Sequence, residues 1–141
     1  MRDLVPQIGE GFEGDAPNLA HVNTVLGLRD GPVGSAWATA LASPRPGHTP
    51  FMTVLQPGLP VAPPTLFVNK ATIAGDEHGR LTWGAAQAGV AQGVGRAVAR
   101  GVIDADRLGE LVIIAAVWVD PAANDETAVF TNNSAATFTA L

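Results

Sequence analysis

The sequence has 141 residues, a length typical of one domain, and 47% of them are hydrophobic, enough for a buried core. The net charge is −5, and the eight lysines and arginines form no run, which argues against partners such as nucleic acid or an anionic membrane surface. The chain has no cysteine, which excludes disulfides, thiolate metal sites and cysteine nucleophiles. Because the N-terminal residues are acidic and interrupted by Gly and Pro, we expect a soluble, cytoplasmic protein without a secretory leader.

The first half of the chain is predicted to form strands separated by turns rich in Gly and Pro. The expected elements are an edge strand at 5–13, a turn at 15–18, a strand at 19–28, a helix at 34–42, a strand at 51–55, a rigid loop at 56–64 and a strand at 65–73. Alternation along the second strand places His21 and Asn23 on one face. Ser35 is the expected N-cap of the helix, because serine accepts hydrogen bonds from free helical N–H groups. Lys70 falls on an otherwise apolar strand face, which is unusual for a lysine.

The second half of the chain is predicted to be mainly helical, with one central strand. The expected elements are a turn at 75–79, a helix at 81–100, a short turn of helix at 104–110, a strand at 111–119 and a last helix that begins near Asn124 and runs toward Leu141. Each glycine inside a helix costs about 1 kcal/mol relative to alanine. The four glycines of the long helix therefore predict close packing against a neighbouring backbone, at Gly84, Gly89, Gly93 and Gly95. The whole pattern predicts one α+β domain over 1–141, a two-layer sandwich of a sheet and helices.

Three common chemistries find little support in the sequence. No serine lies in a Gly-x-Ser-x-Gly motif, which argues against a serine hydrolase of that type. Residues 89–95 resemble a glycine-rich nucleotide motif, but they lie inside a predicted helix, so close packing explains them better. The three histidines, His21, His48 and His78, show no ligand-like spacing, and we expect no bound metal.

Three polar residues on predicted elements are candidates for a functional site. His21 could exchange protons near neutral pH, or it could simply pack against a neighbouring strand. Lys70 could hold an anion or a carbonyl oxygen, or it could be an edge-strand lysine whose ammonium group reaches water. Gln87 could contact a ligand, or it could be a surface or capping amide. Periodicity alone leaves these alternatives open.

Several segments, in one order and register from about residue 7 to 130, resemble the formaldehyde-activating enzyme family. The similar segments are IGEGFEGD at 8–15, LAHVNTVLG at 19–27, PGLPVAPPTLFVNKATI at 57–73, GAAQAGVAQGV at 84–94 and GVIDADRLGELVIIAAVWV at 101–119. The resemblance implies the fold of the second domain of ribosomal protein S5 and a homopentameric ring. The low share of charged residues, 15%, is compatible with a surface partly covered by sister subunits.

The resemblance also implies a reaction and a set of site residues. Members of the family condense formaldehyde with tetrahydromethanopterin, a reduced pterin that acts as co-substrate, in one-carbon metabolism and formaldehyde detoxification. By position, His21 is the catalytic acid that helps water to leave. The residues that correspond to pterin contacts of the family are Asn23, Met52, Lys70, Thr72 and Gln87. No covalent cofactor and no metal is implied.

The sequence departs from the family pattern at a few positions. Asn23 stands where the family has aspartate, Ala88 where it has histidine and Met52 where it has leucine. The chain is also expected to be short at its C-terminus compared with other members. An amide can form hydrogen bonds but cannot accept a proton as a carboxylate does. The departures therefore keep two alternatives open: a paralogue that binds a pterin, folate or aldehyde as carrier or sensor, and an enzyme of the same fold acting on another amine and carbonyl.

Overall fold

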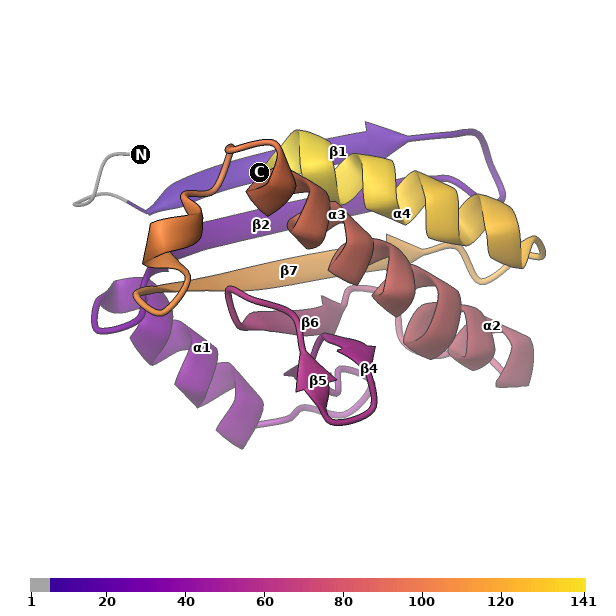
Figure 1. The fold of residues 1–141 in the computed structure, drawn as a ribbon. Helices are drawn as coiled ribbons and strands as arrows, with labels where there is room; N and C mark the ends of the chain where they lie inside the picture. Colours follow the sequence, from indigo (N-terminus) through magenta and orange to yellow (C-terminus); the bar gives the residue numbers. More distant parts are fainter. Residues whose placement is uncertain (1–5) are drawn as a thin grey trace.

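The computed structural model describes residues 6–141 and is built around a five-stranded sheet with the order β1-β2-β7-β6-β3 (Figure 1). Neighbouring strands are antiparallel except β6 and β7, which are parallel. The strands are β1 (Gln7–Glu13), β2 (Ala20–Leu28), β3 (Phe51–Met52), β6 (Thr65–Asn69) and β7 (Leu111–Val119). The predicted edge strand is thus present as β1, and its expected first residue, Val5, lies outside the described residues.

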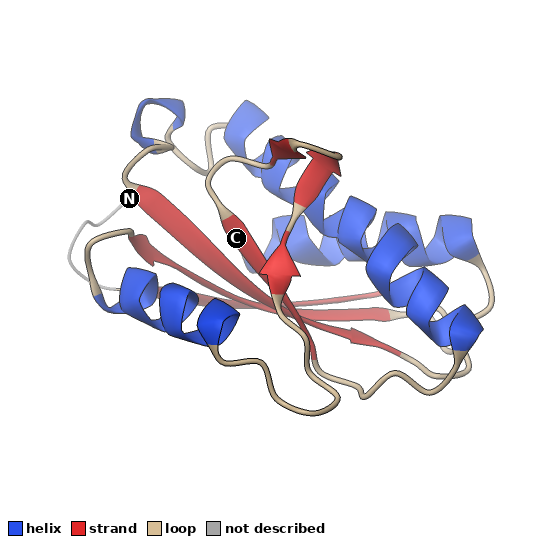
Figure 2. Ribbon diagram, turned by 90° about the horizontal axis from the view of Figure 1, so that it is seen from below, coloured by secondary structure: helices blue, strands red, loops and turns tan. Residues whose placement is uncertain are grey.

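Helices cover one face of this sheet almost completely. The helices α2 (Asp76–Arg80), η1 (Leu81–Ala86) and α3 (Gln87–Ala99) follow one another without a break, and α4 (Glu126–Ala140) packs beside α3 (Figure 1). The α+β class predicted from the sequence is therefore confirmed. A further helix, α1 (Pro32–Ala42), lies on the other side of the sheet, against β2 and β7 (Figures 1 and 2). It adds a short third layer at one end, which the two-layer prediction lacked.

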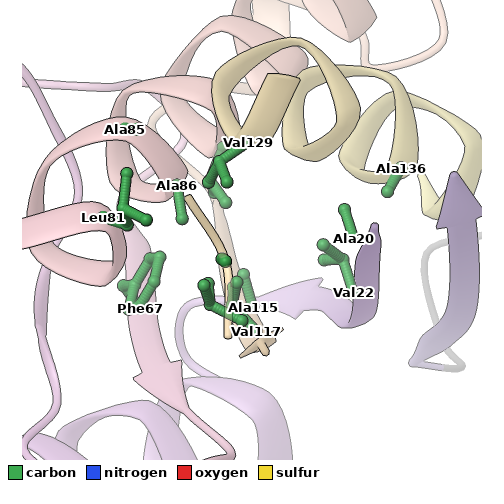
Figure 3. Packing of buried hydrophobic residues seen from close by; sticks show 13 residues of the cluster. Ala20, Val22, Phe67, Leu81, Ala85, Ala86, Ala115, Val117, Val129 and Ala136 are labelled. Atoms are coloured by element: carbon green, nitrogen blue, oxygen red, sulfur yellow. The ribbon is translucent and has the colours of Figure 1, made fainter. Parts of the chain in front are cut away.

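The hydrophobic core lies between the sheet and the layer formed by α3 and α4. Side chains of strands and helices point toward each other there, including Val22 and Val117 from the sheet and Leu81 and Val129 from the helices (Figure 3). All four are almost completely buried. Successive side chains of a strand point to opposite faces. Ala20 and Val22 of β2 face this core, so the odd-numbered residues of β2, such as His21 and Asn23, face away from it. This alternation sets the position of the predicted site.

Two predicted helix starts differ from the structure. The long helical stretch begins at Asp76, not at 81, so the turn predicted at 75–79 is wrong. Two acidic residues in the first helical turn, Asp76 and Glu77, favour a helix N-terminus there. The helix α1 begins at Pro32, because proline suits the first position of a helix. Its N-cap residue is therefore Gly31 and not Ser35, whose N–H instead bonds to the Gly31 carbonyl.

Two strand predictions also change in the structure. Part of the predicted loop at 56–64 is a small hairpin of β4 (Val54–Gln56) and β5 (Leu59–Pro60), which turns at Gly58 with φ of 81°. The strand predicted at 65–73 ends as β6 at Asn69. The Asn69 side-chain nitrogen donates to the carbonyl oxygens of Gly47 and Ala71, at 2.9 and 2.8 Å, and these bonds bend the chain away from the sheet.

The later elements agree with the sequence prediction. The short turn of helix is the 3₁₀ turn η2 (Ala105–Arg107), and the central strand is β7 with its predicted bounds. The last helix, α4, begins after Asp125, whose carboxylate accepts a hydrogen bond from the Ala128 N–H at 3.0 Å. None of the helices in the described part of the chain is long and apolar enough to cross a membrane.

The glycines of the helix predicted at 81–100, which lie in η1 and α3, confirm the packing prediction at two of four positions. A Cβ atom at Gly89 would lie 2.5 Å from the Phe130 carbonyl oxygen, and one at Gly93 would lie 2.6 Å from the Thr137 Cβ atom. Both neighbours belong to α4. Gly84 and Gly95, in contrast, face open space. The absence of a side chain at 89 and 93 thus lets the two helices approach closely.

We expect Gly89→Ala to lower the free energy of unfolding by about 1–3 kcal/mol, because the new methyl group would collide with the backbone of α4. Gly95→Ala is the matched control on the same helix, and it should raise stability by up to about 1 kcal/mol, because alanine favours a helix and the space is open. Chemical denaturation measures both values. Equal effects of the two substitutions would contradict the close approach of α3 and α4.

Candidate functional site

The face of the sheet opposite α3 and α4 carries the predicted catalytic residue. Strand register places side chains there in rows that cross the sheet. One row joins Phe12, His21 and Trp118, and the next joins Glu10, Asn23, Ala116 and Val68. We call this surface the open face, defined by the following residues: Ile8, Glu10, Phe12, His21, Asn23, Val25, Val68, Lys70, Ala116 and Trp118.

Four polar side chains of the open face form a continuous hydrogen-bonded chain. The His21 Nε2 atom lies 2.9 Å from the Glu10 Oε2 atom. The Asn23 side-chain nitrogen donates to the same oxygen at 3.4 Å. The Lys70 ammonium group donates to the Asn23 side-chain oxygen. Three of the predicted site residues, His21, Asn23 and Lys70, therefore lie together, and Glu10 joins them.

Glu10 is held in its ionised form by these contacts. The hydrogen bond with His21, followed by the one from Asn23, lowers the pKa of the Glu10 carboxyl below its usual range. An ionised carboxylate only accepts hydrogen bonds, so the proton between the two side chains is on the His21 Nε2 atom. The other ring nitrogen, Nδ1, has no hydrogen-bond partner among residues 6–141. Nδ1 is therefore the nitrogen that a ligand can reach.

Lys70 is the only lysine of the sequence. It is half-buried, and desolvation lowers the pKa of its ammonium group, while the negative charge of Glu10 opposes this shift. Its direct partner is the neutral amide of Asn23, not a carboxylate. The ammonium group therefore keeps bonding capacity for an electronegative atom of a ligand.

Apolar side chains flank the polar cluster on the open face. The Phe12 ring lies 5.7 Å from the His21 ring between centroids, at an angle of 57°. Phe12 is 61% exposed, and Ile8, in the row on the other side of Glu10 and Asn23, is 81% exposed. Exposed apolar groups of this size beside a polar cluster are typical of a surface that binds a ligand or another protein.

The other predicted contacts lie farther from His21. Met52, in β3, pairs with Leu66, and the register of the sheet puts it on the same face as His21 but near the opposite edge. Thr72 is exposed in the loop after β6, next to Gly47. Gln87 is buried on the helix side of the sheet, where its side-chain oxygen accepts the Val54 N–H at 2.6 Å. Within one chain, Gln87 and His21 are thus on opposite sides of the sheet.

A cleft of about 500 Å³ opens on the same side of the sheet as His21, between α1 and the segment that follows it. The Val68 side chain forms part of its wall, and Val68 belongs to the open face. Hydroxyl groups of α1, the Arg45 guanidinium and the His48 ring line the rest; the residues are Ser35, Thr39, Ser43, Arg45 and His48, with Ala36, Ala40 and Pro50. The cleft thus extends the open face toward α1.

The two remaining histidines bond to backbone atoms. His78 is buried; its Nδ1 atom accepts the Ala74 N–H at 3.0 Å, and its Nε2 atom lies 2.8 Å from the Val119 carbonyl oxygen. The His48 Nδ1 atom lies 2.8 Å from the Asn69 carbonyl oxygen. Within residues 6–141, no three His, Cys, Asp or Glu side chains gather closely enough to hold a metal ion.

Glu10 and Phe12 are the site residues that sequence reasoning missed. Both lie on β1, which the sequence pattern predicts only as an edge strand. The signal was present in the short connection between β1 and β2: a hairpin centred on 15–18 pairs residue 12 with 21 and residue 10 with 23, as observed. This pairing places Phe12 and Glu10 on the same face as His21 and Asn23.

Comparisons with known proteins match this chain over nearly its full length. The model of the family described as formaldehyde-activating enzyme (Fae) matches residues 8–141. A 5,6,7,8-tetrahydromethanopterin hydro-lyase from Methanosarcina barkeri is 39% identical over 138 residues, which cover 98% of this chain and 78% of the relative. A bifunctional enzyme Fae/Hps from Methanococcoides burtonii is 42% identical over 134 residues, which cover 95% of this chain and 34% of the relative. The chain spans about a third of the length of that bifunctional relative.

Proposed function

Since the chain belongs to the formaldehyde-activating enzyme family, we propose that it condenses formaldehyde with tetrahydromethanopterin, or a related reduced pterin, to the methylene derivative with loss of water. The observation that carries the proposal is the arrangement of His21, whose Nε2 atom is held by Glu10 while its Nδ1 atom has no hydrogen-bond partner among residues 6–141. Asn23 and Lys70, two expected pterin contacts, lie in the same hydrogen-bonded chain. The pterin is a co-substrate, and no covalent cofactor or metal takes part.

The proposed mechanism follows from the chemistry of the two substrates. A secondary amine of the pterin attacks the carbonyl carbon of formaldehyde and gives a carbinolamine. Hydroxide is a poor leaving group, so the carbinolamine oxygen must receive a proton before the C–O bond breaks. His21, as imidazolium, supplies that proton and water leaves, which produces an iminium ion. The second pterin nitrogen then attacks the iminium carbon and loses its proton, and the neutral imidazole takes up a proton.

The residues around His21 have complementary roles in this proposal. The Lys70 ammonium and the Asn23 amide hold polar atoms of the pterin, so that both its nitrogens stay near the one-carbon unit. Phe12 offers an apolar surface beside the His21 ring on which a flat heterocycle can lie. Met52 and Thr72 extend the binding surface toward β3 and the loop after β6.

The proposal includes an assembly of several copies, a homopentamer according to the resemblance. The exposed Ile8 and Phe12 side chains give the open face an apolar surface that a second copy can cover. Helix α1 also carries no charged residue, although only Val33 of its residues is buried. A second copy would explain how Gln87, on the far side of the sheet within one chain, takes part in pterin binding.

The test of the proposed function is the rate of condensation of formaldehyde with tetrahydromethanopterin, followed by stopped-flow absorbance with and without the protein. We expect the protein to accelerate the reaction above the spontaneous rate in proportion to its concentration. Absence of acceleration at micromolar protein would refute the proposed activity. Binding of the pterin without acceleration would favour a carrier or sensor. The amide of Asn23, in place of a carboxylate, supports this alternative.

A further inference from the structure

We infer that Glu10 is the positioning residue for His21: its carboxylate holds the Nε2–H group and directs the Nδ1 atom to the substrate. This inference rests on the proposed function, because it assigns to Glu10 the role of the acceptor that holds the second ring nitrogen of an acid–base histidine. In a histidine that transfers protons through one ring nitrogen, a hydrogen-bond acceptor at the other nitrogen fixes the tautomer and the orientation of the ring.

Strand pairing gives Glu10 this position. Glu10 pairs with Asn23 and Phe12 pairs with His21, so the Glu10 side chain stands diagonally beside the imidazole on the same face. The Nε2–Oε2 distance of 2.9 Å is that of a direct hydrogen bond. The Phe12 ring lies against the same imidazole at 5.7 Å, which restricts its rotation from another side. Two residues of β1 therefore fix the ring orientation of one residue of β2.

No other carboxylate among residues 6–141 bonds to His21. The neighbouring residue on the same strand face, Asn23, is an amide and cannot balance a positive charge. Instead, Asn23 donates to the same Glu10 oxygen and accepts from Lys70. The single carboxylate of the cluster is thus shared by His21 and Asn23, and among residues 6–141 it is Glu10 that places a negative charge beside the His21 ring.

The proton balance of the proposed reaction shows what Glu10 does in each step. The His21 Nδ1–H proton moves to the carbinolamine oxygen, the C–O bond breaks, and the nitrogen lone pair forms the C=N bond of the iminium ion. The imidazole is then neutral and keeps the proton on Nε2, which it donates in a hydrogen bond to the Glu10 carboxylate. When the second pterin nitrogen closes the ring, its proton moves to Nδ1 and restores the imidazolium. Glu10 never exchanges a proton, and its charge stabilises the imidazolium between turnovers.

The test compares Glu10→Gln with Glu13→Gln, a control on the same strand at a position that pairs with Ala20 and so faces the helices. We expect Glu10→Gln to lower kcat about tenfold or more with little change in KM, because the amide neither fixes the Nε2–H tautomer nor stabilises the imidazolium as the carboxylate does. Glu10→Asp, which keeps the charge, should retain more activity than Glu10→Gln. Glu13→Gln should behave like the unsubstituted protein. An unchanged kcat in Glu10→Gln, or an effect on KM alone, would overturn the inference.

A second measurement separates this inference from the proposed function. In ¹⁵N NMR spectra of the free protein, neutral His21 should carry its proton on Nε2, and Glu10→Gln should shift the ring toward a mixture of both tautomers. This readout requires no turnover. If the protein does not accelerate the condensation, the proposed function fails, while the NMR result still decides on Glu10. An unchanged tautomer in Glu10→Gln would overturn the positioning role even in an active enzyme.

Discussion

Replacing His21 by alanine is expected to lower the protein-dependent rate of formaldehyde condensation by about 10²–10⁴-fold, the range typical of general acid–base catalysis. On the open face, Glu10 supports the His21 Nε2 atom, and no residue in the described part of the chain bonds to Nδ1. His78 cannot replace it, because both of its ring nitrogens are engaged in the interior. Stopped-flow absorbance with tetrahydromethanopterin measures the effect after subtraction of the spontaneous reaction.

Two controls make the His21 experiment specific. Within the described residues, 6–141, the His21 side chain forms a hydrogen bond only with exposed Glu10, so His21→Ala should change the free energy of unfolding by less than about 1 kcal/mol. Pterin binding, followed by fluorescence or calorimetry, should persist in the variant. If the variant is stable, binds the pterin and still accelerates the reaction as before, His21 is not the acid.

Replacing Lys70 by methionine is expected to raise KM for the pterin about 30-fold or more, because removal of one partner of a desolvated charged contact costs about 2 kcal/mol or more. The side chain of methionine keeps most of the apolar stem of lysine but has no ammonium group. Lys70→Arg keeps the charge and serves as the matched control, with a smaller rise in KM. An equal loss in both variants would indicate that the shape of the side chain matters and not its charge.

The role of Lys70 also predicts a pH dependence. Desolvation lowers the pKa of the ammonium group, so Lys70 loses its proton at a lower pH than an exposed lysine does. Pterin binding should therefore weaken on the alkaline side, beginning below the pH at which ordinary lysines titrate. The pH profile of KM measures this, and the alkaline decline should disappear in Lys70→Met. An unchanged alkaline decline in Lys70→Met would assign it to another group.

Elements with strong local signals could be predicted from the sequence. The run of apolar residues in β7 and the alternation in β2 gave both strands, and Asp125 marked the start of α4. The short turn at 15–18 fixes the register of β1 on β2. The grouping of His21 with Asn23 followed from alternation alone.

Features that depend on tertiary contacts could not be predicted in the same way. Nothing local shows that the Gln87 side chain is bonded to the Val54 N–H on the helix side, because that contact joins segments 33 residues apart. The side of the sheet on which α1 lies is likewise set by the packing of Val33 against Gly27. The contact of Lys70 with Asn23 depends on how β6 lies beside β7 and β2.

The single lysine has a consequence for a protein whose proposed substrate is formaldehyde. Formaldehyde reacts with primary amines and then links them to neighbouring groups, so lysine-rich surfaces are progressively cross-linked by it. Apart from the amino group at the start of the chain, this sequence offers only one such amine, and that one is half-buried and bonded to Asn23. The positive charges elsewhere are arginines. The choice of cation thus leaves few primary amines that the proposed substrate could modify.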